Sequence, residues 1–392
     1  MKLWQKDYSL NSEIEKFTVG NDYIIDRKLI KYDVQGSLAH AKMLNKIGIL
    51  TDSEHKKISA ALKEIIELDK SGKFEIKVED EDCHTAIENY LVKKLGNTGK
   101  KIHTARSRND QVLTALRLYY KDELKNILEL SENFIESLKK FSKGYGAIKI
   151  PGYTHMRKAM PSSICLWVGS FIESMNDNKF LIESTAKLID QSPLGTGAGY
   201  GLPIKVDRKL TAAELGFSRI QENPIYAQNS RGKFESIILN LMTQLMCDLN
   251  KISSDLILFS MDEFGFFVLP KEFCTGSSIM PHKKNPDVLE IVRAKYSIVL
   301  GYEFQVKSMI ANLPSGYNRD LQLAKEAVMS AIDATKDCMK IMSLLVSNLK
   351  ADKEKCENAM TKELFSVNEI MNLVGNGTPF RDAYKIVSKK YK

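Results

Sequence analysis

The chain has 392 residues, of which 43% are hydrophobic and 27% charged, so it can bury a large core and belongs to the globular class. Its apolar runs are short and its first residues carry no apolar signal core, so we expect a cytoplasmic protein without a membrane span or secretory leader. The net charge of +8 is spread along the chain, and it fits attraction of a small anionic substrate as well as binding of nucleic acid.

Helical periodicity organises most of the chain. Residues 1–105 are expected to form shorter helices, because turn signals recur at Gly72, Gly96 and Gly99. Long helices are predicted next, because apolar residues recur there at spacings of three and four with almost no breaker. No convincing strand pattern and no internal repeat is present, and the tail after residue 356 is predicted to be a short helix pair broken at 375–379. The predicted long helices cover residues 106–143, 162–190 (less regular, with Gly169 inside), 233–264, 287–312 and 318–349.

These helices predict the architecture. A helix of thirty-odd residues spans roughly 45–50 Å at ~1.5 Å per residue, which is longer than a small domain is wide. The helices must therefore pack side by side, which predicts an all-α fold with a long central bundle whose remaining apolar faces are buried against other subunits. We expect an N-terminal helical domain over 1–105, the central bundle over 106–356 and a short C-terminal helical domain over 357–392.

A polar segment precedes the predicted helix at 287. Residues 276–290 read Gly-Ser-Ser-Ile-Met-Pro-His-Lys-Lys-Asn-Pro-Asp-Val-Leu-Glu. Gly276 gives the backbone more conformational freedom. Ser277 offers a hydroxyl, and beside it Lys283 offers a positive charge and Asn285 an amide. An ordinary polar surface loop is the alternative, but loops with such chemistry commonly carry function.

The segment Thr104–Gln111 opens the first long helix. Ser107, Asn109 or Asp110 could cap this helix. Capping does not explain two arginines in three residues at the positive end of a helix dipole. We therefore predict that Arg108 and Asn109 bind a carboxylate, together with the exposed N–H groups of the helix start.

Three further clusters have ordinary alternatives when taken alone. Thr154 and His155 end a Pro-Gly-Tyr-Thr-His turn, but a lone histidine is more often structural than catalytic. Glu290 could orient a histidine from elsewhere, or could be a simple first-turn glutamate. A helix start near 318 places Gln322 and Lys325 on one face, with Tyr317 about a turn earlier, which is also typical of a solvated helix start.

Taken together, these clusters resemble the argininosuccinate lyase family of the fumarase/aspartase superfamily, to which the delta-crystallins are related. The resemblance covers nearly the whole chain. Its motifs are Met1-Lys-Leu-Trp4, Asp33-Val-Gln-Gly-Ser37, Glu81-Asp-x-His84, His103-Thr-Ala-Arg-Ser-Arg-Asn-Asp-Gln-Val112, Pro151-Gly-Tyr-Thr-His155, Pro193-Leu-Gly-Thr-Gly197, the Gly-Ser-x-x-Met-x-x-Lys-x-Asn signature at 276–285, Tyr317-Asn-Arg-Asp-Leu-Gln322 and Thr378-Pro-Phe-Arg-Asp-Ala383.

The resemblance implies a homotetramer whose active sites are each built from three subunits, and an anti β-elimination that splits argininosuccinate into arginine and fumarate. It implies no metal and no organic cofactor. The six cysteines agree, because they lie far apart without a Cys-x-x-Cys pair, which argues against a zinc site and a disulfide framework.

The resemblance also implies roles for single residues. Ser277 matches the catalytic base on a mobile loop, Lys283 matches a group that binds the succinyl carboxylate and the developing charge, and His155 paired with Glu290 matches the acid or charge stabiliser. The residue chemistry agrees, because removing a weakly acidic carbon proton requires donors and cations already in place. The implied substrate contacts are Arg108, Asn109, Thr154 and Asn285 at the carboxylates, and Asp26, Tyr317, Gln322 and Lys325 at the arginine end.

The chain departs from the family pattern in several places. Gln5–Tyr8 replaces Gly-Gly-Arg-Phe, Asp22 stands where a serine is usual, His282 replaces a glutamine, and Asn229–Gly232 replaces a more acidic segment. The sequence after Thr378 is also shorter than usual. Three alternatives are another fumarate-releasing lyase such as adenylosuccinate lyase, a non-catalytic structural protein on the same scaffold, and a nucleic-acid-binding helical protein, which rests on net charge alone.

Overall fold

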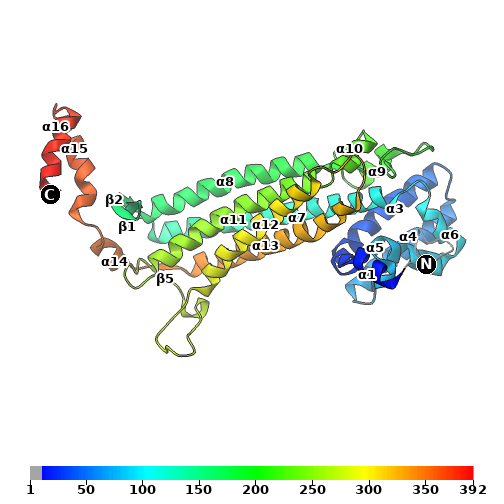
Figure 1. Cartoon of the computed structure of the whole chain (residues 1–392), viewed down its shortest axis with the longest axis horizontal. Helices are drawn as coiled ribbons and strands as arrows, with labels where there is room; N and C mark the ends of the chain where they lie inside the picture. Colours follow the sequence, from blue (N-terminus) through cyan, green and yellow to red (C-terminus); the bar gives the residue numbers. More distant parts are fainter. Residues whose placement is uncertain (1–10, 392) are drawn as a thin grey trace. The chain divides into compact units, whose positions relative to one another are not determined.

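The computed structural model describes residues 11–391 and is built mainly of helices (Figure 1). The departure at Gln5–Tyr8 lies outside the described residues. The chain divides into two compact units that share the five long helices, and each is described by itself. Unit 1 contains the residues up to Asn126, Ile182–Leu239 and Tyr302–Ser330, and unit 2 contains Ile127–Leu181, Asn240–Gly301 and Ala331–Lys392.

The long helices predicted from periodicity are present. They are α7 (Arg108–Tyr145), α8 (Ile164–Ile189), α11 (Lys233–Phe259), α12 (Asp287–Ile310) and α13 (Ala324–Asn348). The all-α prediction is therefore confirmed.

Two predicted helix boundaries were wrong. The helix predicted to reach 264 ends at Phe259 and passes into turns before Gly265, whose φ of +60° leaves the helical region. The helix predicted from 318 begins only at Ala324, after the 3₁₀ helix η5 (Arg319–Leu323).

Unit 1 is a compact group of short helices joined to the ends of the long ones. Thr51 starts α4 with a capping box, because its hydroxyl accepts from Glu54 N while the Glu54 carboxylate accepts from Thr51 N. Leu29, Leu44 and Leu62 are fully buried in its core. Its elements are α1 (Ser12–Val19), α2 (Asp22–Ile25), η1 (Asp26–Leu29), α3 (Ile30–Lys46), α4 (Asp52–Lys70), η2 (Val78–Asp80), α5 (Cys83–Leu95), α6 (Asn97–Lys100), η3 (Lys101–His103), α9 (Arg208–Glu214), α10 (Pro224–Asn229), and the parallel pair β3 (Gln191–Ser192) and β4 (Arg219–Ile220).

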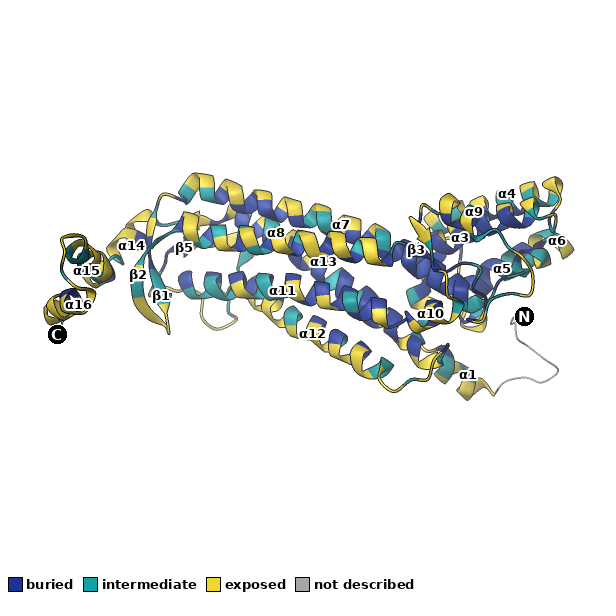
Figure 2. Ribbon diagram, turned by 90° about the horizontal axis from the view of Figure 1, so that it is seen from above, coloured by how far each residue is buried: buried dark blue, intermediate teal, exposed yellow. Residues whose placement is uncertain are grey.

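Unit 2 packs segments of the long helices side by side (Figures 1 and 2). Asn178 of α8 donates to Asp248 of α11 at 2.6 Å, and the Ser253 hydroxyl of α11 lies 3.7 Å from the Met342 sulfur of α13. Figure 2 shows buried stripes alternating with exposed ones along these helices. The remaining elements are β1 (Lys149–Thr154), β2 (Arg157–Ser163), β5 (Phe267–Val268), η4 (Lys271–Phe273), β6 (Lys350–Ala351), α14 (Lys353–Asn358), η6 (Lys362–Phe365), α15 (Ser366–Gly375), α16 (Phe380–Ser388) and η7 (Lys389–Tyr391).

Strands β1 and β2 form an antiparallel hairpin that the sequence analysis did not predict. Pro151, Gly152 and Pro161 lie within or beside its pairing, and they hide the alternation by which strands are recognised. The register also shifts between Pro151 and Tyr153, which is typical of a β-bulge.

No helix within residues 11–391 is both long and apolar enough to cross a membrane. The division into domains at 105 and 356 is not tested by these two units, and it stays a prediction.

A buried polar network joins three helices of unit 1. His84 of α5 lies with Nδ1 3.1 Å from Oδ1 of Asp33 in α3, and Gln111 of α7 donates to the same oxygen at 2.8 Å. Burial raises the pKa of the Asp33 carboxyl, but His84 more than reverses this, so that pKa lies below its usual value. Burial lowers the pKa of the His84 imidazole, but Asp33 outweighs it and the pKa lies above its usual value. The two side chains therefore form a buried ion pair.

This ion pair makes the stability of unit 1 depend on pH. Asp33 contributes stability above the ordinary carboxyl pKa of 3.8 and loses it as the pH falls through its lower folded pKa. His84 contributes below the ordinary imidazole pKa of 6.5 and loses it as the pH rises through its higher folded pKa. We expect the difference in unfolding midpoint between wild type and Asp33→Asn to be largest between these two values and to shrink on both sides.

Thermal unfolding followed by circular dichroism from pH 3 to pH 9 measures this difference. Asp122→Asn is the control, because it removes a half-exposed carboxylate that accepts from Lys31 and from the Tyr32 hydroxyl, and it should cost at most about 2 kcal/mol at every pH. A difference between wild type and Asp33→Asn that is the same at every pH would contradict the buried ion pair.

Candidate active site

Lys325, in the first turn of α13, is held by two carboxylates in unit 1. Its Nζ lies 2.6 Å from Oδ1 of Asp26 and 2.9 Å from Oδ2 of Asp22. Burial lowers the pKa of Lys325, but the two carboxylates more than reverse this and raise it above its usual value. The lysine is therefore a fixed, buried cation.

The two carboxylates are not equivalent. The Asp26 side chain is completely buried, and its second oxygen lies 3.4 Å from the backbone N of Cys83, which donates to it. The Asp22 side chain retains 16% of its exposure. Burial raises the pKa of Asp22 to about 6, with Lys325 opposing the rise and Asp26 and Asp82 adding to it. Asp22 is thus the more exposed and the more distant of the two carboxylates that contact Lys325.

Arg108, at the start of α7, carries a second set of acidic partners. Its Nη1 lies 3.1 Å from Oε2 of Glu81, and its Nε lies 3.1 Å from Oδ2 of Asp82. Asp82 also caps α5 by accepting from Thr85 N at 2.8 Å. The sequence analysis quoted the Glu81-Asp-x-His84 motif but assigned it no role. In the structure, Glu81 and Asp82 of this motif orient Arg108.

Ser107 and Asp110 act as capping residues, which was one of the alternatives considered for them. Asn109 N donates to the Ser107 hydroxyl at 3.3 Å, and Ser107 N donates to Oδ1 of Asp110 at 2.9 Å. The other oxygen of Asp110 accepts from the N–H groups of Gly195 and Gly197, both at 2.9 Å. This arrangement anchors the start of α7, where Arg108 and Asn109 lie.

Tyr317 is positioned by the segment 229–232, where the chain departs from the family pattern. Asn229 accepts from Gly316 N at 2.8 Å, and the Arg231 guanidinium lies 5.0 Å from the centre of the Tyr317 ring. Gln322 does not bond to Lys325 but donates to the carbonyl of Thr18 at 3.0 Å. Gln322 and Lys325, which were predicted to share one helix face, thus contact different segments: Gln322 contacts the end of α1, and Lys325 contacts α2 and η1.

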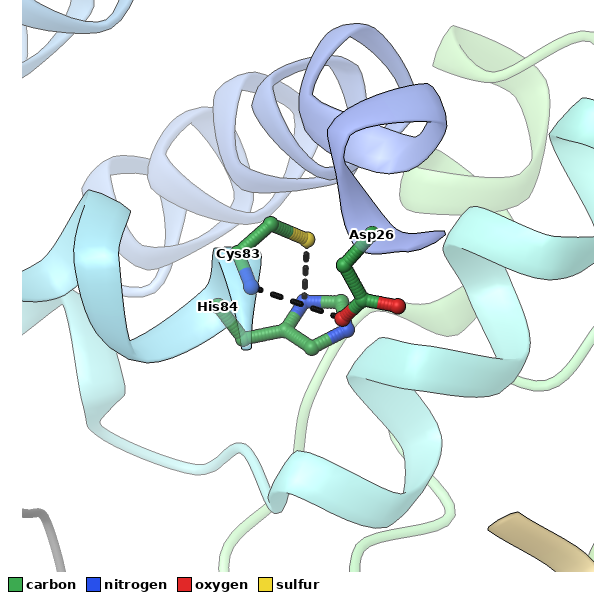
Figure 3. Close-up of side chains that lie close together, drawn as sticks. All are labelled: Asp26, Cys83 and His84. Carbon is green, nitrogen blue, oxygen red and sulfur yellow. Dashed lines mark hydrogen bonds between the residues drawn. The ribbon is translucent and has the colours of Figure 1, made fainter. Parts of the chain in front are cut away.

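Three buried side chains could together ligate a metal ion: Asp26, Cys83 and His84 (Figure 3). The Cys83 sulfur lies 3.7 Å from Nδ1 of His84. This nitrogen already faces Asp33, and one oxygen of Asp26 already binds the Lys325 ammonium. Burial, with Asp26 and the neighbouring carboxylates, raises the pKa of the Cys83 thiol well above its usual value. These contacts favour a protonated Cys83 thiol and a protonated His84 imidazole, and neither of these protonated forms binds a metal ion.

The polar loop of unit 2 lies between η4 and α12, and its ends are clamped together. Thr275 N donates to Asn285 O at 3.1 Å, and Asn285 N donates to Thr275 O at 2.8 Å. The Asn285 amide also donates to Gly276 O at 3.2 Å. The predicted residues Ser277, Lys283 and Asn285 therefore belong to one closed loop.

Ser277 accepts two backbone hydrogen bonds within this loop. Its Oγ lies 3.3 Å from Ile279 N and 3.1 Å from Met280 N. Lys283 is exposed, and so is His282. The arrangement gives the serine oxygen donors that favour negative charge, while the side chains around it face outward.

Thr154 and His155 lie at the exposed tip of the β1–β2 hairpin. Thr154 pairs with Arg157, so His155 and Met156 are the two central residues of the turn, with φ of +50° and +58°. Among the described residues, no ion pair or hydrogen bond joins His155 to Glu290, which is exposed in the first turn of α12. Within the described part of one chain, the two predicted partners therefore do not form a pair.

A family model described as a lyase matches residues 14–301. The chain is 55% identical to an argininosuccinate lyase of Thermotoga neapolitana over 390 residues, which cover 100% of this chain and 98% of that protein. It is 42% identical to the argininosuccinate lyase of Phocaeicola vulgatus over 98% of this chain and 86% of that one.

Solved structures share the fold. A class II fumarase of Schistosoma mansoni matches with a TM-score of 0.82 at 18% identity, over 96% of this chain and 89% of that one. An EDDS lyase variant with bound fumarate matches with a TM-score of 0.79 at 23% identity, over 97% of this chain and 76% of that one. By its matches over the whole length, this chain belongs to the lyase family and, within it, to the argininosuccinate lyases.

Proposed function

We propose that this protein splits argininosuccinate into arginine and fumarate by an anti β-elimination, as a carbon–nitrogen lyase of arginine biosynthesis. The observation that carries the proposal is the clamped loop 275–285, which keeps the family signature in a chain 55% identical to an argininosuccinate lyase. Incubation with argininosuccinate while recording the absorbance of fumarate tests it. A folded protein that releases no fumarate would overturn it.

Ser277 takes the proton from the carbon next to the breaking C–N bond. A serine hydroxyl is a poor base unless nearby positive charge stabilises its alkoxide. The N–H groups of Ile279 and Met280 already donate to its Oγ, and Lys283 of the same loop supplies the charge. The electron pair of the C–H bond forms the double bond of fumarate, and the pair of the C–N bond leaves with the guanidino nitrogen.

Cations and amide donors bind the carboxylates of the succinyl end. Removing the proton places a second negative charge on one of these carboxylates, so groups that stabilise it act mainly on the transition state. Lys283, Asn285 and Thr154 serve the carboxylate that takes up this charge. Arg108 and Asn109 contact the substrate carboxylates from the start of α7.

His155, oriented by Glu290, protonates or stabilises the leaving guanidino group. His155 lies at a hairpin tip and Glu290 is exposed on α12, so each is open to a partner from another chain. The arginine end is bound by Tyr317, Gln322 and Lys325, and Asp26 contributes by holding Lys325. None of these steps needs a metal or an organic cofactor.

We further propose a cytoplasmic homotetramer with active sites shared between subunits. Within unit 2, large apolar side chains are exposed on three long helices, and such patches mark subunit interfaces. They are Leu166 and Phe180 of α8, Ile291 and Ile298 of α12, and Leu344 of α13, each more than half exposed.

Ser277→Ala is expected to lower kcat at least about a hundredfold while leaving substrate affinity nearly unchanged, because the hydroxyl takes the proton but adds little ground-state binding. Steady-state fumarate release measures this. Ser278→Ala is the matched control, since it removes a neighbouring hydroxyl of the same loop. A Ser277→Ala protein with more than about a tenth of the wild-type kcat would rule out the base assignment.

Hybrid tetramers test the shared sites. Ser277→Ala and His155→Ala are each expected to be nearly inactive, and mixing them with subunit exchange should restore up to about a quarter of wild-type activity, because some sites then draw both intact residues from different chains. Native mass spectrometry confirms the exchange. Absence of recovery after confirmed exchange would exclude sites that combine these two residues from different subunits.

Lys325→Met is expected to raise KM more than it lowers kcat, because its contact is the same in ground and transition states. It should also destabilise the protein by about 3–5 kcal/mol, because two carboxylates lose their cation. Lys42→Met is the control, since it breaks an exposed pair with Glu214 and should cost less than about 1 kcal/mol. An unchanged KM in a folded Lys325→Met protein would remove Lys325 from the substrate site.

A further inference from the structure

His40 is a buried titratable side chain that the proposed mechanism does not use. It lies in α3 and is 1% exposed. Its Nε2 lies 2.9 Å from the carbonyl oxygen of Thr104, which only accepts, so Nε2 carries the hydrogen and donates it. Burial, with the charge of Arg106 adding to it, lowers the pKa of the imidazole to about 3. His40 is therefore a neutral hydrogen-bond donor around neutral pH.

The segment that His40 holds is the link between η3 and α7. Ala105, the residue after Thr104, has a φ of +58°, in the left-handed region that residues other than glycine rarely adopt. On the other side of this turn, Nη1 of Arg106 donates to the Ser37 hydroxyl at 2.8 Å. Ser37 and His40 are three residues apart, so they lie on one face of α3. This face therefore fixes both residues that flank the left-handed turn.

Stability alone explains neither the histidine nor the turn. The Nδ1 atom of His40 has no hydrogen-bond partner among the described residues, and an unsatisfied polar atom in the interior costs free energy. A left-handed alanine also costs free energy, which a glycine at position 105 would avoid. Such strained and unsatisfied groups cluster at functional sites, where the surrounding structure imposes them. The two costs therefore indicate a role in the site that follows the turn.

The left-handed turn leads directly into the start of α7. Arg108 and Asn109 lie in the first turn of this helix, three and four residues after Ala105. On the far side, Asp110 accepts from two N–H groups of the loop 195–197. The start of α7 is thus held from both directions. A different φ at Ala105 would redirect the chain before Arg108 and move its guanidinium away from its present position.

We propose that His40 is a positioning residue for the substrate-binding start of α7. By donating to the Thr104 carbonyl, it holds the left-handed turn at Ala105 in the conformation that places Arg108 and Asn109. The proposal rests on the proposed function, because it requires that these two residues bind the substrate carboxylates. In this role His40 touches no substrate and transfers no proton.

Two substitutions of matched length test the hydrogen bond. His40→Gln keeps an N–H donor, whereas His40→Met fills similar space without one. We expect His40→Met to raise KM for argininosuccinate at least about tenfold and to lower kcat by less, because contacts to the substrate carboxylates exist before the reaction begins. His40→Gln should keep KM within about threefold of the wild-type value. Steady-state fumarate release measures both constants, and equal KM values in the two variants would overturn the proposal.

Leu62→Ala is the control for a general loss of stability. Leu62 of α4 is fully buried in the core of unit 1, so its truncation should lower the unfolding midpoint but leave KM unchanged. Circular dichroism measures the midpoint. A KM that rises as much in Leu62→Ala as in His40→Met would show that His40 acts through stability, and the proposal would be wrong.

Substitutions at Ala105 test the turn itself. Glycine adopts the left-handed region at lower cost, so adding Ala105→Gly to His40→Met should recover at least about threefold of the lost kcat/KM. No recovery in the folded double variant would contradict the proposal, because a histidine that only fills space would not be replaced by a relaxed turn.

Ala105→Val tests the turn with His40 in place. A β-branched residue is strongly disfavoured in the left-handed region, so KM should rise at least about tenfold in the folded protein. A wild-type KM in this variant would overturn the proposal even if no His40 variant folded. Fumarate release by wild type keeps the proposed function intact in all these outcomes, and its absence would overturn both.

Discussion

The pairing of the buried Lys325 ammonium with two carboxylates is the interaction on which this part of the candidate site depends. A cation with 3% of its surface exposed is stable only with anionic partners at contact distance, and here they come from α2 and η1, at the opposite end of the sequence. The lysine therefore ties the first turn of α13 to the N-terminal helices. Apolar residues could join these elements at lower electrostatic cost, so the retention of buried charge indicates a function beyond stability.

Charge also organises the neighbouring helix starts. Arg108 pairs with Glu81 and Asp82, and His84, two residues after Asp82, pairs with Asp33. Asp82 serves two purposes, because it caps α5 and orients the arginine. The same residues thus start a helix and shape a polar site, which reduces the number of buried groups that must be satisfied separately.

Periodicity predicted the long helices well, because α7 and α11 carry apolar residues at regular spacing over many turns. It failed at residues 149–163, where two prolines and a glycine conceal a hairpin, and at 318–323, where a 3₁₀ turn precedes α13. The candidate site was found through motifs, but its pairings were not. Asp26 and Lys325 are 299 residues apart, and no local pattern indicates that they meet.

The loop 275–285, which we propose carries the base, contrasts with the buried pairs around Lys325. The Thr275–Asn285 bridge fixes the ends of the loop and two N–H groups hold the Ser277 oxygen, yet Lys283 and Glu290 are exposed and His155 lies on an exposed tip. Removal of a carbon proton requires that water be excluded from the base and from the developing charge. One chain does not enclose these groups within its described residues, so their enclosure must come from loop movement or from a neighbouring subunit. The proposed sharing of active sites between subunits would supply this enclosure and would also cover the apolar helix faces.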